Sequence, residues 1–118
     1  MDEIVIYEKS TCTKCRAAIT ILDENGVAYR TVRYHDTPLT REKLTDLIRK
    51  LGIRAIELFR TKDPVYKELR LGERIMGDDE AVELLLTYPD LIQRPILERG
   101  EKAIIGRPSE RITEFLRA

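Results

Sequence analysis

The chain has 118 residues, which is enough for one domain around a single hydrophobic core and short for two. Lysine and arginine total 21, aspartate and glutamate also total 21, and the zero net charge gives no reason to expect nucleic acid or an anionic membrane as a partner. The longest apolar runs, such as residues 84–86, are too short to span a bilayer. The N-terminus has no basic segment followed by an apolar stretch, so we expect no signal peptide and a cytoplasmic protein.

The first third of the chain predicts a strand, a helix and a second strand. Residues 3–8 form an apolar run of the kind found in buried strands. The helix that follows has four residues on one face: Cys15, Ala18, Ile19 and Leu22. It ends at Asn25-Gly26, and residues 27–34 are rich in β-branched and aromatic side chains. Such a unit predicts two parallel strands joined by a right-handed crossover.

The middle of the chain is predicted to be helical. One helix ends at Gly52 and carries an apolar stripe formed by Leu44, Leu47, Ile48 and Leu51. Residues 55–60 could be a short helix or a loop. Asp63 with Pro64 favours a short helix, and Asp78 with Asp79 opens another that ends before Pro89.

The last quarter predicts a hairpin and a helix. Residues 95–97 and 103–105 flank a turn that contains glycine. Pro108 then begins a helix, and we expect the side chains of Ile112, Phe115 and Leu116 to point inward. The order βαβα, a helical middle and ββα fits an α/β thioredoxin-like fold with a mixed four-stranded sheet. We therefore expect a single domain over 1–118 with an all-helical insertion at about 40–90.

Cys12 and Cys15 are the only cysteines, and they lie where the first strand leads into a helix. Unpaired N–H groups and the positive end of the helix dipole favour thiolate over thiol at this place, and Lys14 and Arg16 add positive charge. Cys12 is the candidate nucleophile, and Cys15 could close a disulfide with it. A bridge across two residues would stabilise the fold little, so the spacing favours redox chemistry in a reducing compartment.

Two other interpretations of this pair stay open. Small, partly buried cysteines can simply pack a helix N-terminus. A metal site is less well supported, because it needs about four ligands and only His35 remains as a soft ligand elsewhere.

Three arginines are further candidates because of their neighbours. Arg60 follows an apolar run and precedes a helix cap. Arg94 precedes Pro95 and Arg107 precedes Pro108, which biases both arginines toward extended backbone. From their context alone, all three could be ordinary surface charges.

Four groups of residues carry a resemblance to a known family: Cys12 with Arg16, residues 58–62 (LFRTK) with 66–69 (YKEL), residues 88–96 (YPDLIQRPI) and residues 105–108 (IGRP). The last two segments are the most specific. On these residues the chain resembles, over nearly its whole length, the glutaredoxin-linked arsenate reductase family, which also includes the Spx-type transcription regulators.

The resemblance implies a thioredoxin-type fold, a nucleophilic Cys12, and an oxyanion pocket formed by Arg60, Arg94 and Arg107. It also implies that Pro95 is cis and lies beside the cysteine. Arginine offers paired, permanently charged donors to a tetrahedral anion such as arsenate. The implied reaction is attack of Cys12 on arsenate, followed by reduction of the adduct to arsenite by glutathione. Glutaredoxin then recycles the mixed disulfide, and no bound cofactor is needed.

The sequence departs from the family pattern at the site itself. It has Cys15 where the reductases usually have serine, Ser10-Thr11 where an Asn-Pro pair is common, and Glu8 where a histidine is often found. A carboxylate close to a thiol raises the pKa of that thiol. Cys15 resembles the two-cysteine switch of the Spx branch, and an internal disulfide would let thioredoxin or glutaredoxin recycle the protein.

Three hypotheses about function follow. The first is an arsenate reductase, the second is an Spx-like redox-sensing regulator that binds RNA polymerase, and the third is a general dithiol–disulfide oxidoreductase. The arginines argue against the third, because a protein disulfide needs no anion pocket. Arg60 and residues 106–108 favour the first over the second. Neutral charge and the lack of a basic helix argue against direct nucleic-acid binding, and nothing in the sequence demands more than a monomer.

Overall fold

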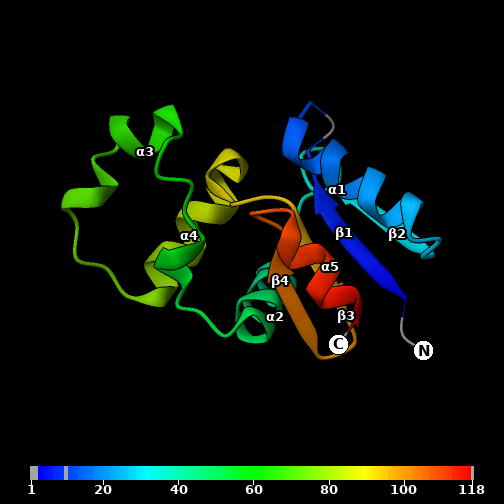
Figure 1. Cartoon of the computed structure of the whole chain (residues 1–118). Coiled ribbons are helices and arrows are strands. Elements are labelled where there is room, and N and C mark those ends of the chain that lie inside the picture. Colours follow the sequence, from blue (N-terminus) through cyan, green and yellow to red (C-terminus); the bar gives the residue numbers. More distant parts are fainter. Residues whose placement is uncertain (1–2, 10, 118) are drawn as a thin grey trace. The chain divides into compact units, whose positions relative to one another are not determined.

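The computed structural model describes residues 3–9 and 11–117 (Figure 1). Ser10, which with Thr11 replaces the Asn-Pro pair common in the family, lies outside the described residues. The chain divides into two compact units. The sheet unit comprises Met1–Thr37 and Arg94–Ala118, and the helical unit comprises Pro38–Gln93. The organisation as a single domain with an insertion at about 40–90 stays a prediction.

The sheet unit contains four strands: β1 (Ile4–Glu8), β2 (Tyr29–Arg33), β3 (Ile96–Arg99) and β4 (Lys102–Ile105). Their order in the sheet is β2-β1-β3-β4. β1 pairs with β2 in parallel, whereas the β1–β3 and β3–β4 pairs are antiparallel. This mixed sheet, with a βαβ unit followed by ββα, confirms the predicted α/β thioredoxin-like architecture.

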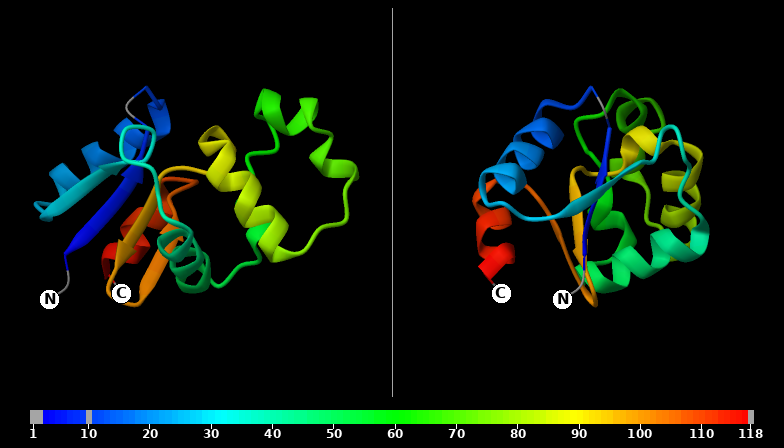
Figure 2. Two further views of the ribbon diagram at one scale, coloured as in Figure 1. Left: turned by 180° about the vertical axis from the view of Figure 1, so that it is seen from behind. Right: turned by 90° about the vertical axis from the view of Figure 1, so that its right-hand side faces the viewer.

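Two helices, α1 (Thr13–Glu24) and α5 (Glu110–Arg117), cover the same face of this sheet (Figure 2). Side chains alternate between the faces of a strand, so Ile4, Ile6 and Glu8 of β1 point toward α1. The first two join the main core, whose buried members are Ile4, Ile6, Ala18, Leu22, Leu97, Ile112 and Phe115. Helix α1 contributes to this core through residues three and four apart, which share one helical face.

The start and end of α1 follow from local sequence. Cys12 is the N-cap, with extended backbone angles, and its side chain accepts a hydrogen bond from the main chain of Cys15. Asn25 caps the other end, and Gly26 then adopts a φ of 63°, a left-handed conformation that costs glycine little. The helix therefore begins at the cysteine pair, as the sequence predicts.

The helical unit contains α2 (Arg41–Leu51), α3 (Pro64–Glu68) and α4 (Asp78–Thr87). Three short 3-10 helices accompany them: η1 (Ala55–Leu58), η2 (Leu71–Glu73) and η3 (Pro89–Leu91). The Thr40 hydroxyl accepts from the main-chain N–H of Lys43 at 3.0 Å, and Gly52 ends α2 with a φ of 69°. The segment that the sequence left undecided is η1.

Several element boundaries differ by one or two residues from the sequence-based expectation. The second strand covers Tyr29–Arg33 within the predicted range 27–34. The last helix begins at Glu110, two residues after Pro108, because the first main-chain bonds of this turn run to the carbonyls of Pro108 and Ser109. Across the described residues, every helix is too short or too polar to cross a membrane.

Candidate active site

The two cysteines lie at the carboxyl end of β1, where the chain enters α1. The main-chain N–H of Cys12 donates to the carbonyl of Lys9 at 2.9 Å, which turns the chain after the strand. The Sγ atom of Cys12 lies 3.4 Å from the main-chain nitrogen of Cys15. Both side chains are buried, and they are not joined by a disulfide. The structure thus holds a dithiol pair at a helix N-terminus, the arrangement predicted from the sequence.

The pKa values of the two thiols are shifted in opposite directions. Burial opposes ionisation of Cys12, but hydrogen bonds from Cys15 and the Arg94 guanidinium outweigh it and lower the pKa of Cys12 to about 7. Burial, together with the hydrogen bond to Cys12 and the negative charges of Cys12 and Glu8, raises the pKa of Cys15 to about 12. Near neutral pH, Cys12 is therefore the more acidic thiol of the pair, and Cys15 keeps its proton.

Arg94 reaches the cysteines because of the strand register. β3 is antiparallel to β1, with Ile96 opposite Tyr7, so the residues that precede β3 lie at the edge where β1 ends. The Arg94–Pro95 peptide is cis, as the family resemblance implied. The Arg94 side chain is 7% exposed and interacts electrostatically with Cys12. A buried guanidinium next to Cys12 stabilises the thiolate and offers paired donors that suit an anion.

Arg107 is tied to the same edge through the backbone. Its Nε donates to the main-chain carbonyl of Arg94 at 2.6 Å. Gly106, directly before it, packs so closely that an added Cβ would lie 3.1 Å from Pro95 and from Leu97. The Arg107–Pro108 peptide is also cis. The structure therefore brings Arg107 next to Arg94 as the chain leaves β4.

Oε2 of Glu8 and the hydroxyl of Tyr34 are buried in this region without a hydrogen bond of normal geometry within the described chain, and their residues are 2% and 1% exposed. Burial raises the pKa of Tyr34 to about 12, although the neighbouring Arg94 opposes this, so the hydroxyl stays protonated at neutral pH. Buried polar groups normally have partners, so each exception needs an explanation, of which a bound polar ligand or water is one.

Tyr34 is the residue that the sequence-based reasoning missed. It directly follows β2, whose last residue, Arg33, pairs with Glu8 at the end of β1. Two parallel strands ending together place the next residues at one edge. That signal is present in the sequence, but a tyrosine after a strand usually means only a packed aromatic residue.

Arg60 and Arg16 are placed differently from Arg94. Arg60 belongs to the helical unit, where its Nη1 lies 3.2 Å from Asp63 Oδ2 and 3.2 Å from the carbonyl of Asp90. Arg16 lies exposed on α1, with its main-chain N–H bonded to the carbonyl of Cys12. The roles assigned to these two side chains stay predictions.

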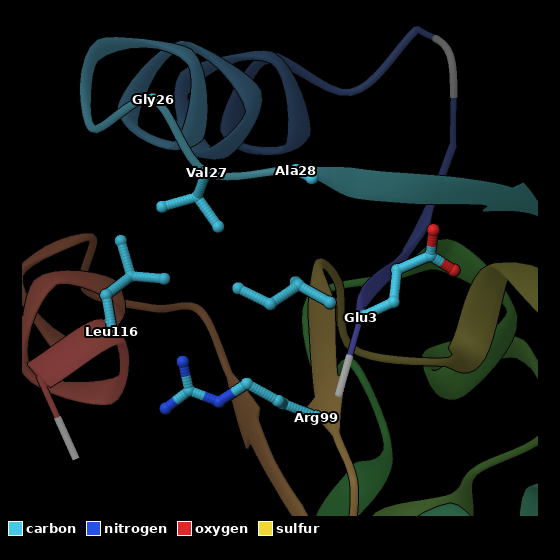
Figure 3. A pocket seen from close by; sticks show the side chains of 7 residues that line it. Glu3, Gly26, Val27, Ala28, Arg99 and Leu116 are labelled. Atoms are coloured by element: carbon cyan, nitrogen blue, oxygen red, sulfur yellow. The ribbon is translucent and has the colours of Figure 1, made fainter. Parts of the chain in front are cut away.

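A separate pocket of about 500 Å³ opens at the other end of the sheet unit (Figure 3). It is lined by Glu3, Ile4, Gly26, Val27, Ala28, Arg99 and Leu116. Ile4 is the first residue of β1, whereas the cysteines follow the last, so this pocket is not part of the cysteine site. No group of three or more side chains suited to hold a metal ion occurs among residues 3–9 and 11–117.

Comparisons with known proteins agree with this geometry. A model of the ArsC family matches residues 7–115. An arsenate reductase of Neisseria meningitidis is 38% identical over 117 residues, which cover 98% of this chain and all of the relative. One from Haemophilus influenzae is 32% identical over 114 residues, covering 96% and 98% of the two chains.

Solved structures give the same result. An arsenate reductase from Vibrio cholerae superposes with a TM-score of 0.89 at 33% identity, covering 96% of this chain and 97% of the other. The family model and these relatives span nearly the whole chain. The chain belongs to the ArsC family.

Proposed function

We propose that this protein is a thiol-dependent arsenate reductase in which Cys12 is the nucleophile. One observation carries the proposal. A buried cysteine at the N-terminus of α1, with its pKa lowered to about 7, lies beside the buried guanidinium of Arg94. A thiolate and a cation in a desolvated place suit attack on an anion, because the guanidinium both stabilises the thiolate and attracts the substrate.

The oxyanion would bind between the start of α1 and the arginines. Arsenate carries its negative charge on tetrahedral oxygens, which take paired guanidinium donors from Arg94 and Arg107. The unpaired N–H groups at the start of α1 add donors, and the Tyr34 hydroxyl supplies another. Arg60 is the third arginine that the family resemblance assigns to the pocket.

The reaction would proceed in two steps. In the first, the Cys12 thiolate attacks arsenic, an S–As bond forms, and a protonated oxygen leaves as water. In the second, another thiolate attacks Sγ of Cys12, an S–S bond forms, and the S–As bond breaks. The electron pair of that bond stays on arsenic, which leaves as arsenite. Two thiols are oxidised to one disulfide, and arsenic(V) is reduced to arsenic(III).

We assign the second thiol to Cys15, one helical turn from Cys12. The internal disulfide would then be reduced by thioredoxin or glutaredoxin. Glutathione is the alternative source of the second thiol, with glutaredoxin recycling the mixed disulfide. Neither route needs a bound cofactor, and both need the reducing conditions of the cytoplasm, where we place the protein.

The proposal is tested by steady-state arsenite production. Purified protein is supplied with arsenate and either glutathione with glutaredoxin or thioredoxin with its reductase, and the Cys12→Ser variant is the control. We expect arsenite from the wild type with at least one donor system and none from the variant. If neither system yields arsenite, the assignment is wrong. Binding to RNA polymerase that changes with the redox state would then favour the regulator hypothesis.

A further inference from the structure

Glu8 is a buried carboxylate that the proposed reaction leaves without a role. It is the last residue of β1 and is 2% exposed. Oε1 forms an ion pair with Nε of Arg33 at 3.2 Å, and Arg33 is the residue opposite it on β2. Oε2 is buried with no hydrogen-bond partner in the described chain. An acceptor oxygen held dry and unpaired is costly, so its surroundings call for an explanation.

The packing of α1 on β1 directs this carboxylate toward the helix face on which Cys15 lies. Ile4, Ile6 and Glu8 point to the face that α1 covers, from the first to the last residue of the strand. The buried residues of α1 are Leu22, Ala18 and Cys15, and the helix runs back along the strand. Leu22 and Ala18 join the same core as Ile4 and Ile6, so the next position on each element pairs Cys15 with Glu8.

The charges around this pair support the placement. The negative charge of Glu8 contributes to the raised pKa of Cys15, which shows that the two groups interact. The other titratable groups that interact with them are Arg33 and Tyr29 of β2, Tyr34 directly after β2, and Cys12. Arg33 is more than half exposed and bonds to Oε1, which leaves Oε2 available on the buried side.

Cys15 needs a proton acceptor if it is to resolve the adduct on Cys12. A buried thiol whose pKa is about 12 holds only a trace of thiolate at neutral pH, and the thiolate is the attacking species. Once Cys12 is bonded to arsenic or sulfur, it no longer carries a thiolate beside Cys15. Burial and Glu8 still hold the proton on Cys15. Water has little access, since the Cys15 side chain is 1% exposed.

We propose that the Glu8 carboxylate takes the proton of Cys15 as Cys15 attacks Sγ of Cys12. The thiol S–H bond breaks, an O–H bond forms on Oε2, and the S–S bond forms. The leaving group, arsenite or a thiolate, departs with the electron pair of its bond to Cys12. The net charge of the Glu8–Cys15 pair does not change during proton transfer, so the step avoids two adjacent buried negative charges. This inference rests on the resolving role of Cys15 in the proposed function.

The test uses a reaction that needs no arsenate, so that its failure differs from a failure of the proposed function. Dithiobis(nitrobenzoate) reacts with Cys12 and releases one coloured thiolate in a first phase. Attack of Cys15 on the mixed disulfide releases the second coloured thiolate and leaves the Cys12–Cys15 disulfide. The two phases therefore report the two cysteines separately in stopped-flow absorbance.

Glu8→Gln keeps the shape of the side chain and the acceptor for Arg33 but removes the proton acceptor. We expect the second phase to slow by a factor on the order of 10², while the first phase keeps its rate. The second-phase rate in this variant should rise about tenfold per pH unit, because only the thiolate fraction reacts. Glu8→Asp, which retains a carboxylate, should recover part of the rate.

Glu98→Gln is the matched control. Glu98 is also a buried carboxylate, 5% exposed, and it lies in β3 opposite Val5, where it accepts from the Tyr7 hydroxyl at 2.6 Å. Val5 and Tyr7 point to the face opposite Glu8. We expect both phases to keep their wild-type rates in this variant. A general effect of losing a buried charge would instead slow both variants alike.

Several outcomes would overturn the proposal. One is an unchanged second phase in Glu8→Gln, and another is an equal slowing of both phases, which would indicate a structural role. If Glu8→Gln does not fold, the pH dependence of the second-phase rate in the wild type tests the proposal. With a built-in acceptor its second-phase rate levels off near neutral pH, whereas a rate that keeps rising about tenfold per pH unit would refute the role of Glu8.

Discussion

The main-chain N–H of Cys15 donates a hydrogen bond to Sγ of Cys12 across 3.4 Å. The bond helps to stabilise the Cys12 thiolate, and the Cys15 thiol beside it stays protonated. The same helical turn thus lowers the pKa of Cys12, whereas the pKa of Cys15 is raised and its thiol stays protonated. The predictions below concern this asymmetry and the groups that produce it.

The acidity of Cys12 should depend on Arg94. The rate of Cys12 alkylation by iodoacetamide, followed against pH, should have its midpoint near the wild-type pKa of about 7. Arg94→Gln removes a positive charge and a hydrogen bond, so the midpoint should move up toward the ordinary thiol range. Arg111→Gln, which removes an exposed charge on α5, should leave it unchanged. A midpoint that stays near 7 in Arg94→Gln would contradict the role of this guanidinium.

The stability of the protein should fall at alkaline pH because of Cys15. Its pKa is about 12 in the folded protein against an ordinary value of 9.0, so the folded state binds the proton more tightly. The stabilisation is complete below about pH 9 and is lost as the pH rises toward 12. Cys15→Ser should therefore lose less stability than the wild type as the pH rises above about 9, measured by urea denaturation with reductant present.

Cys12 should show the opposite dependence. Its pKa falls from 9.0 to about 7 on folding, so its ionisation contributes stability above pH 9 that is lost as the pH falls to 7. Between about pH 7 and pH 9, the wild type should gain stability relative to Cys12→Ser. Equal pH profiles for the two proteins would show that folding leaves the acidity of Cys12 unchanged.

Removal of the Tyr34 hydroxyl should affect ligand binding more than stability. The hydroxyl is buried without a hydrogen bond of normal geometry, so Tyr34→Phe should keep the melting temperature or raise it. The same variant should show a smaller rise of melting temperature with arsenate, because one donor to the anion is lost.

Tyr7→Phe is the control for this variant. The Tyr7 hydroxyl donates to Glu98 at 2.6 Å, and its loss leaves a buried carboxylate with one donor fewer. We expect a loss of about 1–3 kcal/mol in the free energy of unfolding. The rise of melting temperature with arsenate should stay at the wild-type value in Tyr7→Phe. If Tyr34→Phe shows the same rise as the wild type, Tyr34 does not contact the anion.

A side chain at Gly106 should lower the stability of the protein. A Cβ there would lie 3.1 Å from side-chain atoms of Pro95 and Leu97 and 3.2 Å from Ile112. Gly106→Ala should therefore lower the free energy of unfolding by about 1–3 kcal/mol, the usual cost of overpacking. Gly77→Ala is the control, since an added Cβ meets nothing within 4 Å there. In Gly77→Ala the free energy of unfolding should fall only by the modest amount by which a helix N-cap favours glycine over alanine. Equal losses in the two variants, measured by urea denaturation, would contradict this account.

The fold and much of the site followed from the sequence because their signals are local. The period of Cys15, Ala18 and Leu22 identified α1 and its buried face, and the strand before it identified the position of the cysteines. The family resemblance, more than any local pattern, pointed to Arg94 and to the cis peptide at Pro95.

Other features depend on contacts between distant segments. Tyr34 became a candidate only when the register of β2 on β1 was known, because nothing near it in the sequence distinguishes it from a core tyrosine. The unpaired oxygen of Glu8 is likewise a property of packing between β1 and α1. The sequence drew attention to Glu8 as a departure from the family, but it did not indicate which cysteine the carboxylate approaches.

The most direct test of the account is a single turnover without any added thiol. Reduced protein, freed of reductant, is mixed with excess arsenate, and arsenite and the Cys12–Cys15 disulfide are quantified after acid quenching. We predict about one arsenite and one disulfide per wild-type chain, because the chain holds one dithiol pair. Cys12→Ser and Cys15→Ser should yield none. Wild-type protein that forms no more arsenite than Cys12→Ser, here and with both donor systems, would contradict the central claim.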